Sequence, residues 1–544
     1  MRINSIKMLM LFLISITVYS CKTKTSSLAK NINKDVAAAF HVNGKSLFSK
    51  LTWQEISQSE WMKQLKSDTS LSQLSKAVLD NPEVTGIDMN NDFVFFFQKV
   101  LSDANYAGVT GVIKDAGKFK ENAIKITGGA VSESNGIFTI AGSDKLISWK
   151  GNDFVMLANV NTPTSNYLPG EDNKPGQQAD LKAAANAIFT MKAETSLSSD
   201  ARFAETMAKN SDMHLWVNLD AIMKNTASLG MVSSLNLSKV YENSAYGMAA
   251  NFENGKIAMD MKSFMNETVL KIFRDNKNGN ANLALAEKIP SNDVSSIASF
   301  NINPEGMYQL IKLMGVDGFI NMGIAKSGVT AEQLFKAFDG NFFMSTYGMG
   351  DTTYSKKPNL IGSIGVKDKA IFEKLINYVT QSDQSMSKNF VLSENTFTLG
   401  SSPEALNAFN TATAKNNLPF LKDLGGKSFA YYLNLRKMSD YGYQATDSLS
   451  VEMNNATKNT WDYMVMKGGD FDKTGATQTG EVFLLDKNTN SLKVLNNYLS
   501  KMVVLENKRR EKQLTAYSED DTLRAPSVVY PQLVDPPVPT TSQP

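Results

Sequence analysis

The feature that most constrains the fold of this chain is an internal repeat. Residues 35–43 and 293–303 both open with Asp-Val, continue as a run typical of a strand, and close on an Asn that precedes a helical pattern. Further on, Gly111–Asp115 matches Gly365–Asp368, and a Phe follows the Asp at the same spacing in both. The matched segments keep the same order, so the sequence predicts one design used twice.

Turn residues between apolar runs predict hairpins, for example at Asn254-Gly255 and at Gly151-Asn152. Strands therefore follow strands, with occasional helices, rather than alternating as βαβ units. The predicted fold class is α+β, with two tandem similar repeats, each an antiparallel sheet with helices packed on one side. We expect the first repeat to span residues 35–290 and the second residues 291–512.

Six polar residues stand where an apolar, strand-like run gives way to a helical pattern. There an Asn or Asp side chain accepts hydrogen bonds from the free N–H groups of the first helical turn. Loss of such a cap costs about 1 kcal/mol, which explains these residues without catalysis. A polar binding ring formed by the four Asn is the alternative interpretation. The predicted caps are Asn43, Asn218, Asn303, Asn434, Asp115 and Asp368.

The N-terminus is typical of a secreted, lipid-modified protein. Residues 1–20 form a signal peptide whose apolar run is too short to span a bilayer. Cys21 follows, with Val18 three positions before it, and this arrangement resembles the lipobox of bacterial lipoproteins, in which the Cys is acylated. Residues 21–34 are expected to form a polar tether. The resemblance implies anchoring in the outer membrane, facing the periplasm, because neither an Asp nor an acidic cluster follows the Cys.

The C-terminal end changes composition abruptly. A last helix is predicted from Ser491 to about Lys512, and the tail at residues 513–544 holds six of the fifteen Pro residues. A segment of that composition cannot bury a core, so a disordered Pro-rich tail is expected.

Composition excludes several classes of function. Lys+Arg 56 against Asp+Glu 54 gives a formal charge of +2, so a nucleic-acid partner is not expected. One Cys excludes an internal disulfide framework and Cys-based zinc clusters. The two His, His41 and His214, lie in apolar strand-like runs and are interpreted as sheet residues. No serine-hydrolase elbow or His-Glu-x-x-His motif occurs, and no cofactor is expected.

One pattern has the spacing of a calcium-binding loop. Asp470, Asp472, Thr474 and Glu481 stand at positions one, three, five and twelve, with Gly475 at position six. The flanking text, however, is typical of strands, whereas an EF-hand loop joins helices. A β-hairpin with its tip near Lys473-Thr474-Gly475 is therefore the alternative interpretation.

Four segments taken together are distinctive: Cys21, the opening 34–46, Trp53–Ile56 and Trp149–Asp153. With them the sequence resembles an uncharacterised family of bacterial cell-envelope lipoproteins of roughly 500 residues, a domain of unknown function. It implies no catalytic residues. We therefore expect a non-enzymatic binding or scaffold protein, held to the membrane by its N-terminal lipid, with an unknown envelope protein or glycan as partner. A carboxylate-based hydrolase and a calcium-stabilised β module are the two alternatives.

Overall fold

The computed structural model describes residues 26–68, 73–99, 105–142, 145–160, 179–224, 235–350, 357–382, 384–412, 416, 418–439 and 447–523. The predicted signal peptide, Cys21 and the tail beyond Leu523 lie outside these residues. Within the described ranges no helix is long and apolar enough to cross a membrane.

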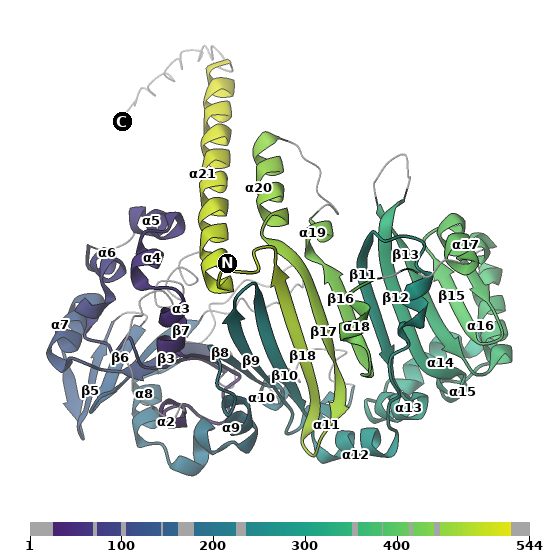
Figure 1. The fold of residues 1–544 in the computed structure, drawn as a ribbon. Helices are drawn as coiled ribbons and strands as arrows, with labels where there is room; N and C mark the ends of the chain where they lie inside the picture. The colour runs from purple at the N-terminus through teal and green to yellow at the C-terminus, as the bar shows by residue number, and fades with distance from the viewer. Residues whose placement is uncertain are drawn as a thin grey trace, which may run out of the picture.

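The described residues form one large antiparallel sheet of eighteen strands with helices around it (Figure 1), which confirms the α+β class. The strands of the first half are β1 (Ala38–Val42), β2 (Phe93–Lys99), β3 (Asn105–Val112), β4 (Ser132–Ser134), β5 (Ile137–Ala141), β6 (Lys145–Lys150), β7 (Asp153–Val160), β8 (Met213–Asn218), β9 (Ala245–Glu253) and β10 (Lys256–Phe264). Those of the second half are β11 (Val294–Asn301), β12 (Phe338–Gly350), β13 (Lys357–Val366), β14 (Phe390–Leu392), β15 (Thr396–Gly400), β16 (Phe429–Asn434), β17 (Trp461–Phe471) and β18 (Gly475–Leu484).

Helices connect the strands in both halves. The first half contains α2 (Ser26–Ala29), α3 (Gly44–Lys50), α4 (Trp53–Ser57), α5 (Glu60–Ser67), α6 (Gln73–Asp80), η1 (Pro82–Thr85), α7 (Ala116–Thr127), α8 (Leu181–Thr190), η2 (Ala193–Thr195), η3 (Leu197–Ser199), α9 (Ala201–Met207), α10 (Leu219–Lys224), α11 (Leu237–Tyr241) and α12 (Glu267–Asp275). The second contains η5 (Leu283–Lys288), α13 (Pro304–Leu313), α14 (Asp317–Ile324), η6 (Ala325–Ser327), α15 (Ala331–Lys336), α16 (Lys369–Ser382), η7 (Gln384–Asn389), α17 (Pro403–Thr411), α18 (Leu421–Leu424), α19 (Leu435–Met438), α20 (Ser448–Lys458) and α21 (Ser491–Leu523).

The two halves are not separate sheets, as expected from the sequence, but are joined by β10 and β18. These strands pair antiparallel along the whole of β10, from Lys256 opposite Phe483 to Phe264 opposite Gly475. Nothing in either strand marks it locally as the partner of the other, because they are more than two hundred residues apart. Long-range pairing of this kind decides the architecture and leaves no short-range pattern.

Strand order on the two sides of this joint runs the same way. From the joint outward, the first half reads β10-β9-β8-β1-β2-β3 and the second half reads β18-β17-β16-β11-β12-β13. Beyond this point the halves differ: β7, β6, β5 and β4 complete the first, whereas β15 and β14 complete the second. The two hairpins expected at Asn254-Gly255 and Gly151-Asn152 connect β9 to β10 and β6 to β7.

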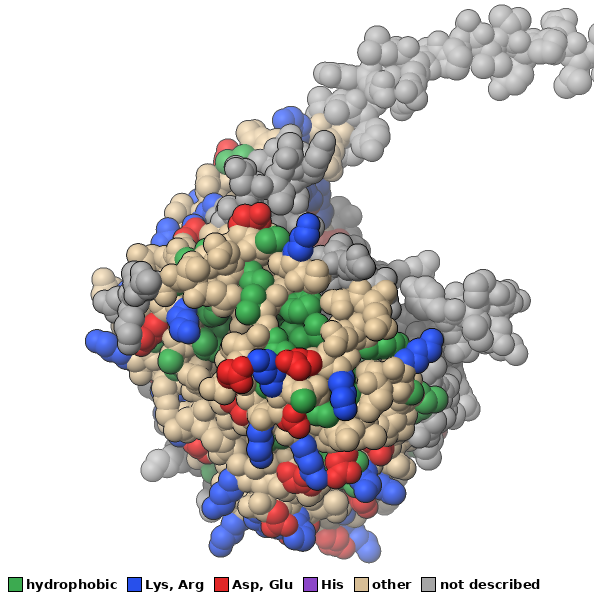
Figure 2. Space-filling model, turned by 90° about the vertical axis from the view of Figure 1, so that its right-hand side faces the viewer, with side chains coloured by type: hydrophobic (Ala, Val, Ile, Leu, Met, Phe, Trp, Pro, Cys, Tyr) green, Lys and Arg blue, Asp and Glu red, His purple; other side chains and the backbone are tan. Residues whose placement is uncertain are grey.

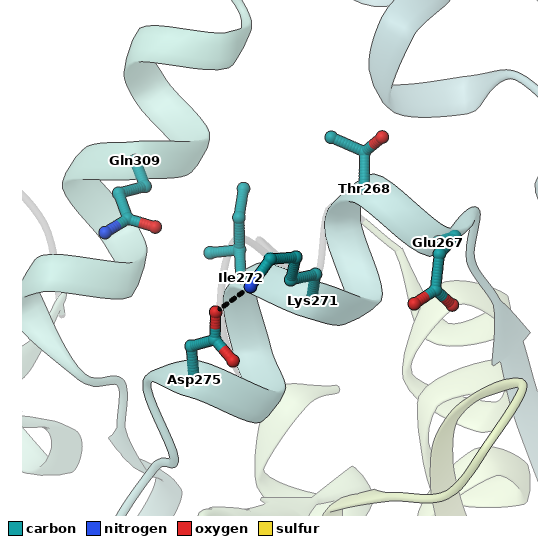
Figure 3. Close-up of a pocket in the computed structure, with 6 residues that line it drawn as sticks. All are labelled: Glu267, Thr268, Lys271, Ile272, Asp275 and Gln309. Atoms are coloured by element: carbon teal, nitrogen blue, oxygen red, sulfur yellow. Dashed lines mark hydrogen bonds and ion pairs between the residues drawn. The ribbon is translucent and has the colours of Figure 1, made fainter.

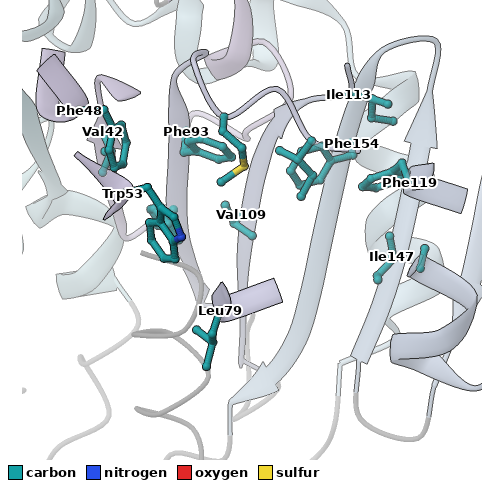
Figure 4. Packing of buried hydrophobic residues seen from close by; sticks show 14 of the residues in the cluster. Val42, Phe48, Trp53, Leu79, Phe93, Val109, Ile113, Phe119, Ile147 and Phe154 are labelled. Carbon is teal, nitrogen blue, oxygen red and sulfur yellow. The ribbon is translucent and has the colours of Figure 1, made fainter. Parts of the chain in front are cut away.

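In the first half the helices cover both faces of the sheet, so the expectation of helices on one side is wrong there. Strand β2 shows the reason: Phe93 and Phe95 point into one hydrophobic cluster, while Val94 and Phe96 point into another on the opposite face. The first cluster packs the sheet against α3 to α7 (Figure 4) and the second against α2, α8 and α9. A continuous apolar run, rather than an alternating one, is what a strand buried on both faces requires.

The second half buries two smaller clusters. Ile297, Phe343 and Tyr432 pack with residues of η5, α17 and α18 on one face of the sheet. Val366 and Phe372 pack with the helical layer of α14 to α16 at the outer end.

Both ends of the described chain differ from expectation. The predicted tether at 21–34 is already folded from α2 onward, because Leu28, Ala29 and Ile32 are buried in the α2–α8–α9 cluster. At the other end, α21 continues past Lys512 to Leu523. It packs against α20 and, as far as Asn507, against α5, and its C-terminal part then projects from the body (Figure 1).

Candidate functional site

The only two histidines of the chain lie on neighbouring strands of the sheet, with their rings tilted against each other. His41 on β1 is the direct cross-strand neighbour of His214 on β8, and both side chains are buried. Their Nδ1 atoms are 2.9 Å apart, and the ring centroids are separated by 5.0 Å. The sequence predicted two sheet residues but not their pairing, since they are 173 positions apart.

The outer nitrogens of the pair have different partners. His214 Nε2 lies 2.8 Å from the Lys209 carbonyl oxygen, to which it can only donate. Nδ1 of a neutral His214 therefore accepts, and His41 Nδ1 is the donor between the rings. His41 Nε2 faces Asp92 Oδ2 at 3.4 Å, a contact that is attractive when this nitrogen also carries a proton. The contacts thus make His41 Nδ1 the donor to a neutral His214, while His41 Nε2 faces Asp92.

The pKa of His214 agrees with this assignment. Burial and the charge of His41 lower it to about 4, although the Lys209 carbonyl, Asp92 and Asp212 act in the opposite direction. At neutral pH His214 is therefore a neutral hydrogen-bonding partner of His41.

A buried carboxylate, Asp212, lies two residues before His214 in the chain and is fully enclosed. Lys50 Nζ donates to its two oxygens at 2.7 and 2.6 Å, Ser46 Oγ donates at 2.5 Å, and the Phe252 backbone N–H donates at 2.6 Å. These donors hold α3, β8 and β9 together. A buried carboxylate needs such pairing to stay charged, so Asp212 is interpreted as a structural group.

The described residues offer these groups no open reaction chamber. One hollow of about 300 Å³ is lined by α12 and α13, where Lys271 pairs with Asp275 at 2.5 Å (Figure 3). A second, of about 260 Å³, lies between α5 and α21. Neither is lined by a histidine or by Asp212, and no group of three or more His, Cys, Asp or Glu among the described residues is placed to hold a metal ion.

The four calcium candidates lie on the β17–β18 hairpin and are not brought together. Asp472 accepts from the Thr474 and Gly475 N–H groups and pairs with Lys262 at 2.5 Å. Asp470 pairs with Lys427, and Glu481 pairs with Lys256 at 2.5 Å. Each carboxylate therefore has a lysine of a neighbouring segment as its counter-ion.

All six residues expected at helix starts accept hydrogen bonds from first-turn N–H groups. Asn43 accepts from Ser46 at the start of α3, and Asn434 accepts from Lys437 at the start of α19. The other four do the same for α10, α13, α7 and α16: Asn218, Asn303, Asp115 and Asp368. They stand at different strand ends and serve as caps, not as one ring.

A different surface combines exposure with apolar character. One cross-strand row, called here the apolar row, crosses six neighbouring strands of the second half on one face of the sheet. None of its members is buried, and Met344 and Leu399 are 47% and 37% exposed. Small residues stand between the large ones, so that the surface of the row has gaps between its large side chains. It consists of Leu399, Gly362, Met344, Ala298, Tyr431 and Met466.

Figure 2 looks at the end of the molecule formed by the outer strands and helices of the second half and shows hydrophobic side chains gathered in a hollow. Charged side chains of both signs lie below it. Apolar patches bordered by polar residues are typical of interaction surfaces.

The fold and these surfaces define an α+β protein built on one extended antiparallel sheet. Residues 29–412 match the family model described as a domain of unknown function (DUF4836), and the chain belongs to this family. The matched range includes the histidine pair, Asp212 and four of the six residues of the apolar row, from Leu399 to Ala298.

Other comparisons give little. No curated protein matches the chain. Among solved structures, crystal forms I and IV of TP0453 are similar, with 7% and 9% identity and a TM-score of 0.25 each. The alignments cover 46% and 47% of this chain, and 86% and 90% of the TP0453 chains. No inference is drawn from these matches.

Proposed function

We propose that the protein is a lipid-anchored, non-enzymatic binding protein of the cell envelope, attached to the outer membrane and facing the periplasm. The signal-like residues 1–20 and the lipobox at Cys21 support the anchor. The apolar row supports the binding role and is the single observation that carries it. We assign it to a partner protein rather than a glycan, because five of its six residues are aliphatic or lack a side chain.

The buried polar groups favour binding over catalysis. His41, His214 and Asp212 are enclosed, and their contacts are with other groups of the protein, which favours a role in the fold. A carboxylate-based hydrolase would need two carboxyl groups facing one cleft. A calcium-stabilised module would need Asp470, Asp472 and Glu481 free of their lysines. The hollow at α12 has two carboxylates in its lining, Glu267 and Asp275, but each pairs with a basic residue of the same helix, Arg274 or Lys271. These ion pairs and those of the hairpin favour neither alternative.

We further propose that the sheet consists of two tandem repeats. The matched segments of the sequence support this, as does the identical strand order on either side of β10 and β18. Helices α7 and α16 add to it, since each follows the third strand of its half and begins after a capping Asp, Asp115 or Asp368. The hairpin of β6 and β7 is then an addition specific to the first repeat.

The anchor is tested by metabolic labelling with a fatty acid and membrane fractionation. The protein should carry the label and sediment with the outer membrane, and Cys21→Ala should lose both properties. A labelled, sedimenting Cys21→Ala protein would contradict the proposal.

The binding role is tested by photo-crosslinking in intact cells. A photoreactive residue at position 399 should give a discrete adduct with an envelope protein, and Met344→Asp should abolish it by placing a charge in the row. Thr479 is exposed on the opposite face of the sheet, so a photoreactive residue there, or Thr479→Asp, serves as the matched control. Adducts of equal yield from both faces, or none from position 399, would overturn the assignment.

A further inference from the structure

We propose that the surface around α2, η2 and η3 faces the membrane and that α21 points away from it. This orientation rests on the lipid anchor proposed above. It follows from how little chain separates Cys21 from the folded body, and it gives the protein a membrane-facing side that the fold alone does not mark.

The connection is short. Leu28 is the first buried residue of the described chain, and only seven residue steps separate it from Cys21. Fully extended, such a segment spans at most about 25 Å. An acyl group on Cys21 lies within the bilayer, so α2 must stay within that distance of the membrane surface.

The attachment point cannot be extended by unravelling the start of the fold. Leu28, Ala29 and Ile32 are buried in the same cluster as Phe203 and Trp216. The Ile32 carbonyl also accepts a hydrogen bond of 2.7 Å from the Leu197 N–H in η3. Releasing α2 would expose this apolar surface at a cost of roughly 25 cal/mol per Å². The length of the segment between Cys21 and Leu28 is therefore fixed by the packing of the core.

The sheet is much wider than the segment between Cys21 and Leu28 is long. From β1 to the outermost strand β14 there are eleven strand spacings, which at about 4.8 Å each make roughly 50 Å. In Figure 1, α2 lies below the sheet, whereas α21 rises on the opposite side. Membrane contact is thus confined to the α2 side.

Charge does not provide this orientation. Around the start of the fold, exposed Lys30 pairs with Asp153. Lys34 and Lys192 are also exposed, but so are Asp35 and Glu194. A surface with balanced charge gains little from anionic lipids. The short segment after Cys21 instead keeps this surface at a high effective concentration near the bilayer. The orientation should therefore persist at high salt.

The experiment uses the acylated protein in vesicles of phosphatidylethanolamine and phosphatidylglycerol that carry a spin-labelled headgroup quencher. Acylation occupies the only native thiol, so an introduced cysteine is a unique site for a fluorescent label. Labels are placed at Lys34→Cys and Lys192→Cys, beside α2. Lys508→Cys, exposed on α21, is the matched control.

The labels at positions 34 and 192 should lose emission in quencher vesicles, and the label at 508 should not, with no change at high salt. Inserting twenty Gly/Ser residues between Cys21 and Ser26 should abolish the difference while leaving vesicle binding intact. Equal quenching at all positions in the native-length protein overturns the orientation. Failure of the cell-derived protein to carry fatty acid would instead overturn the anchor itself.

Discussion

His41 and His214 meet across two antiparallel strands with their Nδ1 atoms 2.9 Å apart, and one of the two rings is neutral at physiological pH. Two imidazolium ions cannot share this contact, because each nitrogen between the rings would then present a proton to the other. The pair therefore tolerates one proton beyond neutrality and not two, so the fold should be sensitive to acid here.

The first prediction concerns acid stability. The pKa of His214 is about 4 in the fold against an ordinary value of 6.5, so the unfolded chain takes up this proton first. Stability is then fully present above pH 6.5 and falls as the pH drops toward 4, by about 3 kcal/mol. Urea unfolding at several pH values measures this fall. In His214→Asn the curve should be flatter over the same interval, and an equally steep curve would contradict the assignment.

The second prediction concerns the enclosed carboxylate. Asp212→Ala leaves Lys50 and the Phe252 N–H without their acceptor, and should lower the free energy of unfolding by about 3 kcal/mol. Asp212→Asn keeps an acceptor oxygen and should lower the free energy of unfolding by less than Asp212→Ala does. Glu121→Ala breaks an exposed pair with Lys125 and should change stability by less than about 0.5 kcal/mol. Similar losses in Asp212→Ala and Glu121→Ala would show that the network carries no stability.

The third prediction concerns the two helices that follow β3 and β13. Asp115→Ala and Asp368→Ala should each lower stability by about 1 kcal/mol, since each removes the cap of a long helix. The corresponding Ser variants should retain most of the stability that the Ala variants lose. The two losses should add in the double variant, because the sites lie in different halves. Thermal or urea unfolding measures all three.

The fourth prediction concerns the joint between β10 and β18. A Cβ on Gly475 would collide with the backbone oxygen of Ser263 on β10. Gly475→Ala should therefore force the strands apart and cost about 2–4 kcal/mol. Gly425→Ala, where a Cβ meets nothing within 4 Å, is the control and should be nearly neutral. A neutral Gly475→Ala would mean that the joint contributes little to stability.

Local features of the fold were predictable from the sequence, and distant ones were not. The caps at Asn43 and Asp115 and the turn at Asn254-Gly255 could be inferred because one short segment carries all of the chemistry involved. Gly475 shows the limit: its spacing from Asp470 suggested a calcium loop, whereas in the structure it allows the close approach of another strand.

The histidine pair and the β10–β18 joint depend on which strands become neighbours. His41 meets His214, and Met259 meets Gly480, only after the chain has folded back over long distances. The burial of both faces of β2 had a signal, the unbroken run from Phe93 to Phe97, because a strand with one solvent face would alternate.

The two outermost strands have a consequence for the protein as a solute. An open sheet of this width ends in two edges with unpaired backbone groups, which other chains can extend. Here β4 and β14 are three residues long, and each pairs with one strand among the described residues. Such short edge strands offer an incoming strand very few backbone groups with which to pair. The short edges thus let the protein carry a very wide sheet without polymerising edge to edge, even at the high local concentration that the proposed lipid anchor would produce.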